Sequence, residues 1–175
     1  MSVLAKYEIK ELIEKYRMIE NYIDLDKQLC EHGFDVTVDK VYEVIDYAVV
    51  DFTNELRRLP KLKEVEFSEY RIEDKVIEAV ILEQGSYVVE LNEIVRLPKD
   101  ICAIVLPRST LIRSGCSLFS AVWDAGYEGK GKLALHVGKR LILTKNARIG
   151  QMIFFKLTRP VEGYSGSYQF EGLRR

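Results

Sequence analysis

The chain is poor in the residues that build disulfide frameworks and structural metal sites. It has only three cysteines and two histidines, and no two cysteines form a Cys-x-x-Cys pair. An odd and scattered set of cysteines argues against a disulfide framework, and the spacing does not fit a structural zinc site. The paired motifs of zinc-dependent deaminases, His-x-Glu and Pro-Cys-x-x-Cys, are missing as well. We therefore expect reduced thiols, packed as small apolar side chains, in a cytoplasmic protein.

Long apolar runs and an excess of one charge are also lacking. No run approaches the roughly 20 residues of a membrane-spanning helix, and the first residues do not read as a signal peptide. A formal net charge of −1 is too small for a surface dedicated to nucleic acid. We expect neither a membrane nor a nucleic-acid partner. With 47 % hydrophobic residues and no dividing linker, residues 1–175 are expected to form one soluble domain.

The hydrophobic pattern favours a mainly β fold after one helix. Ile9, Leu12, Ile13 and Tyr16 recur at helical spacing and predict an amphipathic helix over residues 6–20. Runs rich in β-branched and aromatic residues predict strands at 34–38, 41–45, 47–52, 76–82, 87–91, 101–106, 132–137, 140–143 and 151–157. Many short strands with one confident helix favour a sandwich, roll or barrel over an α/β layer fold.

A charge-rich segment, residues 54–75, separates two groups of these strands. Pro60 blocks a long helix there, because proline lacks an amide proton and clashes with the preceding turn. We expect an excursion between strands, either a surface loop or a contact between subunits.

The stretch 107–131 carries the side chains suited to phosphate chemistry. Arg108 and Ser109 directly follow a predicted strand, and a guanidinium with hydroxyl donors suits phosphate oxygens. Asp124 follows an apolar run, where partial burial would make its carboxylate a better base for a bound water. The pattern indicates a phosphate-ester hydrolase, although a polar surface turn with a capping aspartate has the same residues.

Glycines and a tyrosine follow that aspartate. Gly126 and Gly129 allow a ligand to lie close to the main chain, and Tyr127 offers a flat face to a sugar or base. An ordinary β-turn remains the alternative interpretation of this segment.

Five short motifs occur here in one order. They are Gly33–Val36, Arg108–Leu111, Asp124–Gly129, Arg148–Gln151 and the glycine- and tyrosine-rich tail of residues 160–175. In this order they resemble the dUTPase and dCTP deaminase superfamily, most of all its archaeal dUTP diphosphatases of the deaminase-like branch. The resemblance implies a distorted, jelly-roll-like β-roll with an N-terminal helix within residues 1–22 and a C-terminal tail that acts as a lid. It also implies a homotrimer whose active sites lie between subunits.

The resemblance assigns a role to individual residues. Asp124 would hold and activate the attacking water, while Arg108 and Ser109 would hold the triphosphate of dUTP. The implied substrate-binding residues are Arg113, Tyr127, Lys132, Leu133, Ala134, Gln151, Tyr164, Tyr168 and Gln169. Mg²⁺ is the implied cofactor, carried on the triphosphate and through water, because Mg²⁺ usually keeps several waters. Asp35 is a candidate contact for it, and is equally suited to a role in the fold or at a subunit contact.

One departure from the deaminase pattern separates two activities. Ala134 stands where the deaminases carry a proton-shuttling glutamate, and a methyl group cannot move a proton. Such transfer is commonly worth ~10²–10⁴ in rate. His136 shares the face of Ala134 but lies about 6–7 Å along the strand. The implied activity is hydrolysis of dUTP to dUMP and pyrophosphate. The alternatives are a dCTP deaminase, a bifunctional deaminase and diphosphatase, or a non-catalytic nucleotide-binding protein on the same scaffold.

The tail departs from the deaminase-like pattern as well. Ser167 replaces a lysine and Glu171 replaces a glutamine of that pattern. The tail thereby loses a cation near the expected phosphates, for which Arg174 or Arg175 is a candidate replacement.

Overall fold

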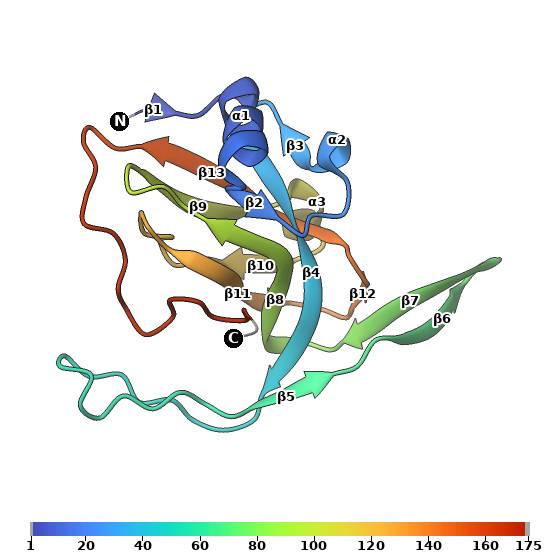
Figure 1. The fold of residues 1–175 in the computed structure, drawn as a ribbon. Coiled ribbons are helices and arrows are strands. Elements are labelled where there is room, and N and C mark those ends of the chain that lie inside the picture. Colours follow the sequence, from blue (N-terminus) through green and yellow to red (C-terminus); the bar gives the residue numbers. More distant parts are fainter. Residues whose placement is uncertain (1, 174–175) are drawn as a thin grey trace.

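The computed structural model describes residues 2–173 and consists mainly of antiparallel β-strands (Figure 1). The strands are β1 (Ser2–Val3), β2 (Ile19–Glu20), β3 (Leu29–Cys30), β4 (Gly33–Val44), β5 (Leu62–Val65), β6 (Ser68–Ile72), β7 (Lys75–Leu82), β8 (Gly85–Arg96), β9 (Ile101–Pro107), β10 (Cys116–Phe119), β11 (Glu128–Val137), β12 (Leu141–Thr144) and β13 (Arg148–Lys156). The helices are α1 (Lys6–Tyr16), α2 (Leu25–Gln28) and α3 (Ser109–Arg113).

Most strands belong to one curled sheet. Its main path runs β1-β13-β4-β8-β11-β10, with β2 on β8, β3 and β5 on β4, and β9 on β13. A smaller sheet, β12-β7-β6, continues into the β6–β7 hairpin that projects to the right in Figure 1. The mainly β prediction and the N-terminal helix are confirmed. The helix ends at Tyr16 instead of residue 20, because Arg17 takes a left-handed backbone conformation that closes the last turn.

Alternation along β11 places the core on one side of that strand, whereas the first six residues of β4 are buried on both sides. In β11, Leu133, Leu135 and Val137 are buried, whereas Ala134 and His136 face outward. Phe34, Met152 and Phe154 from β4 and β13 complete the same contiguous core with Ile9 of α1. No helix among residues 2–173 has the length and apolar character that crossing a membrane requires.

Two expectations about local structure are wrong. Residues 47–52 do not form a strand, since only Val49 makes an isolated bridge, to Arg58. They belong to a projecting segment, residues 45–61, that we call the arm. The segment 54–75 also contains β5 and β6, and α3 was not expected. Short elements of this kind depend on partners distant in sequence, which local patterns do not reveal.

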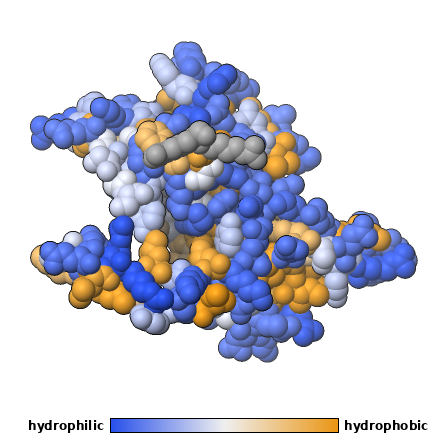
Figure 2. Space-filling model, turned by 60° about the horizontal axis from the view of Figure 1, so that its bottom comes forward, coloured by the Kyte–Doolittle hydropathy of each residue, from blue (hydrophilic) through white to orange (hydrophobic). Residues whose placement is uncertain are grey.

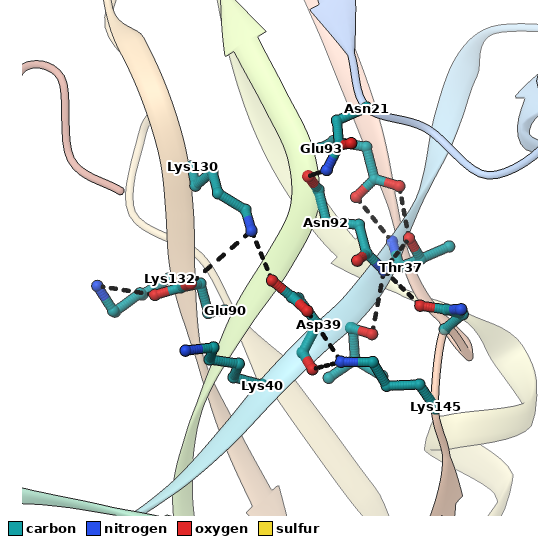
Figure 3. Close-up of polar contacts among 12 residues, drawn as sticks. Asn21, Thr37, Asp39, Lys40, Glu90, Asn92, Glu93, Lys130, Lys132 and Lys145 are labelled. Atoms are coloured by element: carbon teal, nitrogen blue, oxygen red, sulfur yellow. Dashed lines mark hydrogen bonds and ion pairs between the residues drawn. The ribbon is translucent and has the colours of Figure 1, made fainter. Parts of the chain in front are cut away.

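A buried carboxylate joins β4 to β8 at the centre of the sheet (Figure 3). Glu93 is fully buried; Oε1 accepts hydrogen bonds from Gln28 Nε2 (2.7 Å) and Thr37 Oγ1 (2.6 Å). Its Oε2 accepts from the Thr37 amide at 3.0 Å. Asn92 adds a donor to Thr37 Oγ1 at 3.0 Å. Burial raises the pKa of Glu93, although the hydrogen bonds from Thr37 and Gln28 partly oppose this.

The first prediction concerns this buried group. In Glu93→Gln, an amide NH₂ must face a donor from Thr37 or Gln28, so we expect a loss of about 1–3 kcal/mol in the free energy of unfolding. Urea denaturation followed by circular dichroism measures it. Because the pKa of Glu93 is higher in the folded state, its favourable contribution is complete below its unfolded value (about 4.3) and is lost as pH rises. The difference between the two proteins should therefore narrow from acidic to neutral pH.

The matched control is Glu69→Gln, because Glu69 is exposed on β6. It should change the free energy of unfolding by less than about 0.5 kcal/mol. Equal stability of wild type and Glu93→Gln at acidic pH would contradict the importance of the buried hydrogen bonds.

Candidate functional site

A hollow with a volume of about 540 Å³ lies against β11 near the predicted site. We call it the main pocket. Its lining residues come from β5, β8, β11, the turn before β11, the arm and the C-terminal tail: Leu59, Pro60, Leu62, Val88, Ala121, Val122, Trp123, Asp124, Tyr127, Gly131, Lys132, Leu133, Ala134, Tyr164, Tyr168 and Glu171. This size and mostly apolar lining suit a small organic ligand such as a nucleoside. Seen from below, this side of the molecule is hollowed beside hydrophobic surface (Figure 2).

The turn before β11 places Asp124 at the pocket. Trp123 exchanges two backbone hydrogen bonds with Ala103 of β9, at 2.8 and 2.9 Å, and so fixes the residue before the aspartate. Gly126 has φ +84°, and a Cβ there would lie 2.7 Å from Gly163 Cα. Both the backbone angle and the close contact require glycine. The expectation of a partly buried carboxylate is wrong for this chain by itself, because Asp124 is exposed.

Asp124 also lines a second pocket of about 480 Å³, which it shares with Val122 and Tyr164 and which includes Glu162 and Cys102. The carboxylate therefore stands where two hollows meet. If the flat part of a ligand occupied the main pocket and the rest extended into the second pocket, the ligand would lie beside this carboxylate.

Three aromatic rings form one wall of the main pocket. Trp123 and Tyr127 pack edge to face with centroids 5.2 Å apart, and Tyr127 packs against Tyr164 at 5.7 Å. Tyr127 is only 8 % exposed, and burial raises the pKa of its phenol further above the usual value, followed in effect by the nearby Glu171 carboxylate. The phenol therefore stays neutral at physiological pH and acts as a packing surface.

Beside the main pocket, the lysines of β11 form ion pairs with carboxylates of β4 and β8 (Figure 3). Lys132 Nζ lies 2.7 Å from Glu171 Oε1 and 3.3 Å from Glu90 Oε2. Burial lowers the pKa of Lys132, but Glu171 and Glu90 together outweigh this and raise it. Lys132 is therefore a permanent cation in the lining. Lys130 pairs with Asp39 at 2.5 Å next to it.

The C-terminal tail is held along the start of β11. Gln169 Oε1 accepts from the Glu128 amide and its Nε2 donates to the Gly126 carbonyl, both at 3.0 Å. The Phe170 amide donates to Glu128 O (2.7 Å), and the Lys130 amide donates to Glu171 O (2.8 Å). Tyr164 and Tyr168 thus reach the pocket of their own chain. Arg174 and Arg175, the candidate replacements for the tail cation, lie outside the described residues.

A second group of predicted residues gathers around Asp35, whose side chain is 3 % exposed. Its Oδ2 lies 3.1 Å from Arg108 Nε and 3.3 Å from Arg148 Nη1. Gln151 is the register partner of Asp35 between β13 and β4. Ser109 begins α3, which also ends with the exposed Arg113. Gln28 Nε2 donates to Asp35 O at 2.8 Å, so the Glu93 network also supports this group.

The predicted site residues therefore fall into two groups within one chain. Asp124, Tyr127, Lys132, Leu133, Ala134, Tyr164 and Tyr168 line the main pocket, and Gln169 anchors the tail beside it. Arg108, Ser109, Arg113 and Gln151 are not among the residues that line it. In Figure 1 the tail and the arm run along the left and lower side, whereas the Asp35 group belongs to the first part of β4 and the start of α3.

Comparisons with known proteins agree with this scaffold. Residues 3–157 match the model of the dCTP deaminase-like family. The chain belongs to this family. A probable deoxyuridine 5'-triphosphate nucleotidohydrolase of Archaeoglobus fulgidus is 44 % identical to this chain over 175 residues, 99 % of each chain. The deoxyuridine 5'-triphosphate nucleotidohydrolase of Methanocaldococcus jannaschii is 35 % identical over 82 % of this chain and 88 % of its own.

A solved structure shares the dCTP deaminase-like fold. The crystal structure of 2'-deoxycytidine 5'-triphosphate deaminase from Agrobacterium tumefaciens superposes with a TM-score of 0.65 and 21 % identity. The match covers 87 % of this chain but only 46 % of that longer one. At this identity the likeness concerns the fold alone.

Sequence reasoning missed several residues that line the main pocket. Leu59, Pro60 and Leu62 come from the arm and β5, and Val88 comes from β8. No motif marks them, because they reach the pocket only through the pairing of β4, β5, β8 and β11. The one local signal was the apolar spacing of Leu56, Leu59 and Leu62 within an otherwise charged segment.

The second prediction uses the single tryptophan of the chain as a reporter. A Cβ at residue 131 would lie 1.9 Å from Trp123 Cη2, so Gly131→Ala must displace the indole from the pocket wall. We expect a shifted Trp emission spectrum and a loss of about 1–3 kcal/mol in stability through overpacking. Fluorescence and urea denaturation measure both.

Gly85→Ala serves as the control, because a Cβ there meets nothing closer than 3.6 Å. Its emission spectrum should match that of the wild type. An unshifted spectrum in Gly131→Ala would show that Trp123 does not pack on residue 131.

Proposed function

We propose that this protein hydrolyses dUTP to dUMP and pyrophosphate. The carrying observation is the exposed carboxylate of Asp124, which stands between a nucleoside-sized pocket and a second hollow. Two archaeal relatives matched over most of their length, one named a probable deoxyuridine 5'-triphosphate nucleotidohydrolase and the other a deoxyuridine 5'-triphosphate nucleotidohydrolase, support the assignment.

In the proposed reaction, the base and deoxyribose occupy the main pocket and the phosphates extend past Asp124. The carboxylate orients a water molecule and accepts its proton as the water oxygen attacks the α-phosphorus. A new P–O bond forms to the water oxygen, the bond to the α,β-bridging oxygen breaks, and pyrophosphate leaves with that oxygen. Tyr127 would lie against the deoxyribose, where a ribose 2′-hydroxyl would be crowded.

The cations for the triphosphate would come from another copy of the chain. Arg108, Ser109, Arg113 and Gln151 gather away from the main pocket of their own chain, so a single chain lacks the phosphate-binding half of the site. A homotrimer with sites between subunits would bring this group to a neighbour's Asp124. The arrangement of the two groups is the observation that supports shared sites.

Mg²⁺ is proposed to enter with the triphosphate as part of the substrate. Among residues 2–173, no set of three acidic, histidine or cysteine side chains converges as a metal site. Asp35 pairs with Arg108 and Arg148 and is almost fully buried, which favours a role in holding these arginines over one as a metal ligand. Mg²⁺ would neutralise phosphate charge while keeping most of its waters.

The free state of all three cysteines is consistent with the proposed cytoplasmic location.

Ala134 disfavours the deaminase alternatives. It lines the main pocket and pairs in register with Val88 and Phe119, none of which can transfer a proton. Of the described lining residues, Asp124 and Glu171 carry carboxylates, and Glu171 is already paired with Lys132. Hydrolysis at phosphorus requires no proton-transferring side chain next to the pyrimidine ring.

The third prediction tests the reaction itself. The purified protein is incubated with dUTP, dCTP or dTTP, with and without Mg²⁺, and the nucleotides are separated by chromatography. We expect dUMP and pyrophosphate from dUTP only, and faster with Mg²⁺. Formation of dUTP or dUMP from dCTP would instead establish deamination, and no turnover of any nucleotide would favour a pure binding protein.

The fourth prediction concerns Asp124→Asn. The amide retains the shape of the side chain but cannot accept the proton of the water, so kcat should fall by ~10²–10⁴. Binding of an α,β-imido analogue of dUTP, measured by calorimetry, should change little. Asp74→Asn, on the exposed β6–β7 turn, is the control and should turn over normally. Unchanged kcat in Asp124→Asn would remove Asp124 from its proposed role.

A further inference from the structure

The arm, residues 45–61, is a braced extension of the β4–β5 hairpin. Three backbone hydrogen bonds join its two sides: one from Ile45 N to Lys61 O (3.1 Å) and two between Val49 and Arg58 (2.9 and 3.0 Å). Asp46 Oδ1 accepts from the Lys61 amide (2.6 Å), and Oδ2 pairs with Arg58 (2.5 Å). The guanidinium of Arg58 also lies 3.9 Å from the centroid of the Tyr47 ring. These contacts hold the arm in one conformation, so that it can support the C-terminal tail.

The arm meets the C-terminal tail at the rim of the main pocket. Arg57 Nη2 donates to Ser167 Oγ at 3.1 Å, and Arg57 Cζ lies 5.8 Å from the centroid of the Tyr168 ring. Leu59 and Pro60 of the arm and Tyr168 and Glu171 of the tail line the pocket. The arm and the tail come close together at the lower left of Figure 1. Two segments 110 residues apart in sequence thus form one rim.

The chemistry of Arg57 suits a contact that forms and breaks. Arg57 is exposed, and its contacts within residues 2–173 are a neutral hydroxyl and an aromatic face, with no carboxylate among them. A guanidinium can donate a hydrogen bond in its plane while its face stacks on an aromatic ring, which an ammonium cannot do equally well. The contact is therefore specific to arginine, yet weak enough to open when a ligand enters.

The other contacts of the tail go to parts of the chain outside the arm, beginning with the bonds from Val161 N to Lys99 O (2.9 Å) and from Tyr164 N to Ala125 O (2.8 Å). Gln169, Phe170 and Glu171 bind β11 and the turn before it. Arg57 supplies the contact on the opposite side, towards the arm. Without it, the segment around Tyr168 would keep its attachment to β11 but lose the support that closes the rim between arm and tail.

We propose that Arg57 is a positioning residue that fastens the C-terminal tail to the arm and so closes the main pocket over a bound nucleotide. The inference rests on the proposed function for its kinetic consequence, but the contact itself can be tested without any substrate. It assigns the arm, which carries no recognised motif, to the active site. A nucleotide would enter as the contact between Arg57 and the tail opens.

The substrate-free test is hydrogen–deuterium exchange of the full chain. In Arg57→Ala, the amides of Tyr168, Gln169 and Glu171, which donate to acceptors within the tail, should exchange about 5–10 times faster, since opening of the rim becomes easier by that factor, whereas the Phe170 amide should stay protected on Glu128 O. Arg71→Ala, at an exposed arginine of the other projecting hairpin, is the matched control and should leave them unchanged. Unchanged exchange in Arg57→Ala would overturn the proposal, whatever reaction the protein catalyses.

The kinetic test is a double-mutant cycle with dUTP. Arg57→Ala and Tyr168→Ala should each raise KM by about 5–10-fold with kcat within about twofold, because they loosen a lid and do not touch the reacting atoms. The double variant should be no worse than the poorer single variant, because the two residues act through one contact. Arg57→Lys should fall between wild type and Arg57→Ala, and Arg71→Ala should behave as wild type.

Two kinetic results would overturn the inference. Additive losses in the double variant would mean that Arg57 acts on the nucleotide directly and not through the tail. An unchanged KM in Arg57→Ala, with active wild type, would mean that the rim contact does not contribute to binding. Failure of the wild type to hydrolyse dUTP is a separate outcome that rejects the proposed function, and the exchange experiment still decides whether Arg57 holds the tail.

Discussion

Strand β4 changes partners at Thr37 and Val38, and the rest of the structure depends on how this change is made. Before it, β4 pairs with β13; beyond it, β4 pairs with β8 and then β5. Val38 leaves the β13 ladder and exchanges backbone bonds with Asn146 and Ala147 (both 3.1 Å). Glu93 satisfies the backbone and hydroxyl of Thr37 at the same point. A strand that changes partners would otherwise leave polar groups unpaired in the core, which is costly.

The change of partners along β4 also separates the Asp35 group from the main pocket. The first part of β4 carries Asp35 and gathers Arg108 and Arg148, whereas the last part leads into the arm. One rigid strand thus connects the group suited to phosphates with a wall of the pocket suited to a base. The charged pairs of Lys130 and Lys145 with Asp39 hold the middle of this strand against its neighbours, and they lower the pKa of Asp39 although burial opposes them.

Much of this arrangement could be predicted from particular residues, and the reasons for the failures are physical. Strand β11 was predictable because Leu133, Leu135 and Val137 alternate with outward residues, and the turn at Asp124 because glycines and an apolar run enclose it. Residues 47–52 have the composition of a strand, but their one β-type pairing is the isolated bridge of Val49 to Arg58, and Tyr47, Val50 and Phe52 are exposed. The wall formed by Leu59 and Pro60, and the contact of Arg57 with Tyr168, depend on long-range pairing that no local pattern encodes. The motifs also could not reveal that Arg108 and Asp124 lie in different groups of one chain.

The division of the site into two groups has a consequence for how substitutions act. Under the proposed assembly, each copy contributes the carboxylate and base pocket to one site and the arginines around Asp35 to another. A lesion in either group would damage a site that also belongs to a neighbour, while leaving intact the half-site that the same chain offers elsewhere. Two inactive chains with lesions in different groups could then restore some complete sites by assembling together. The activity of such a mixed assembly would depend on the combination of chains in it, and the effect of one substitution could not be judged from a single chain.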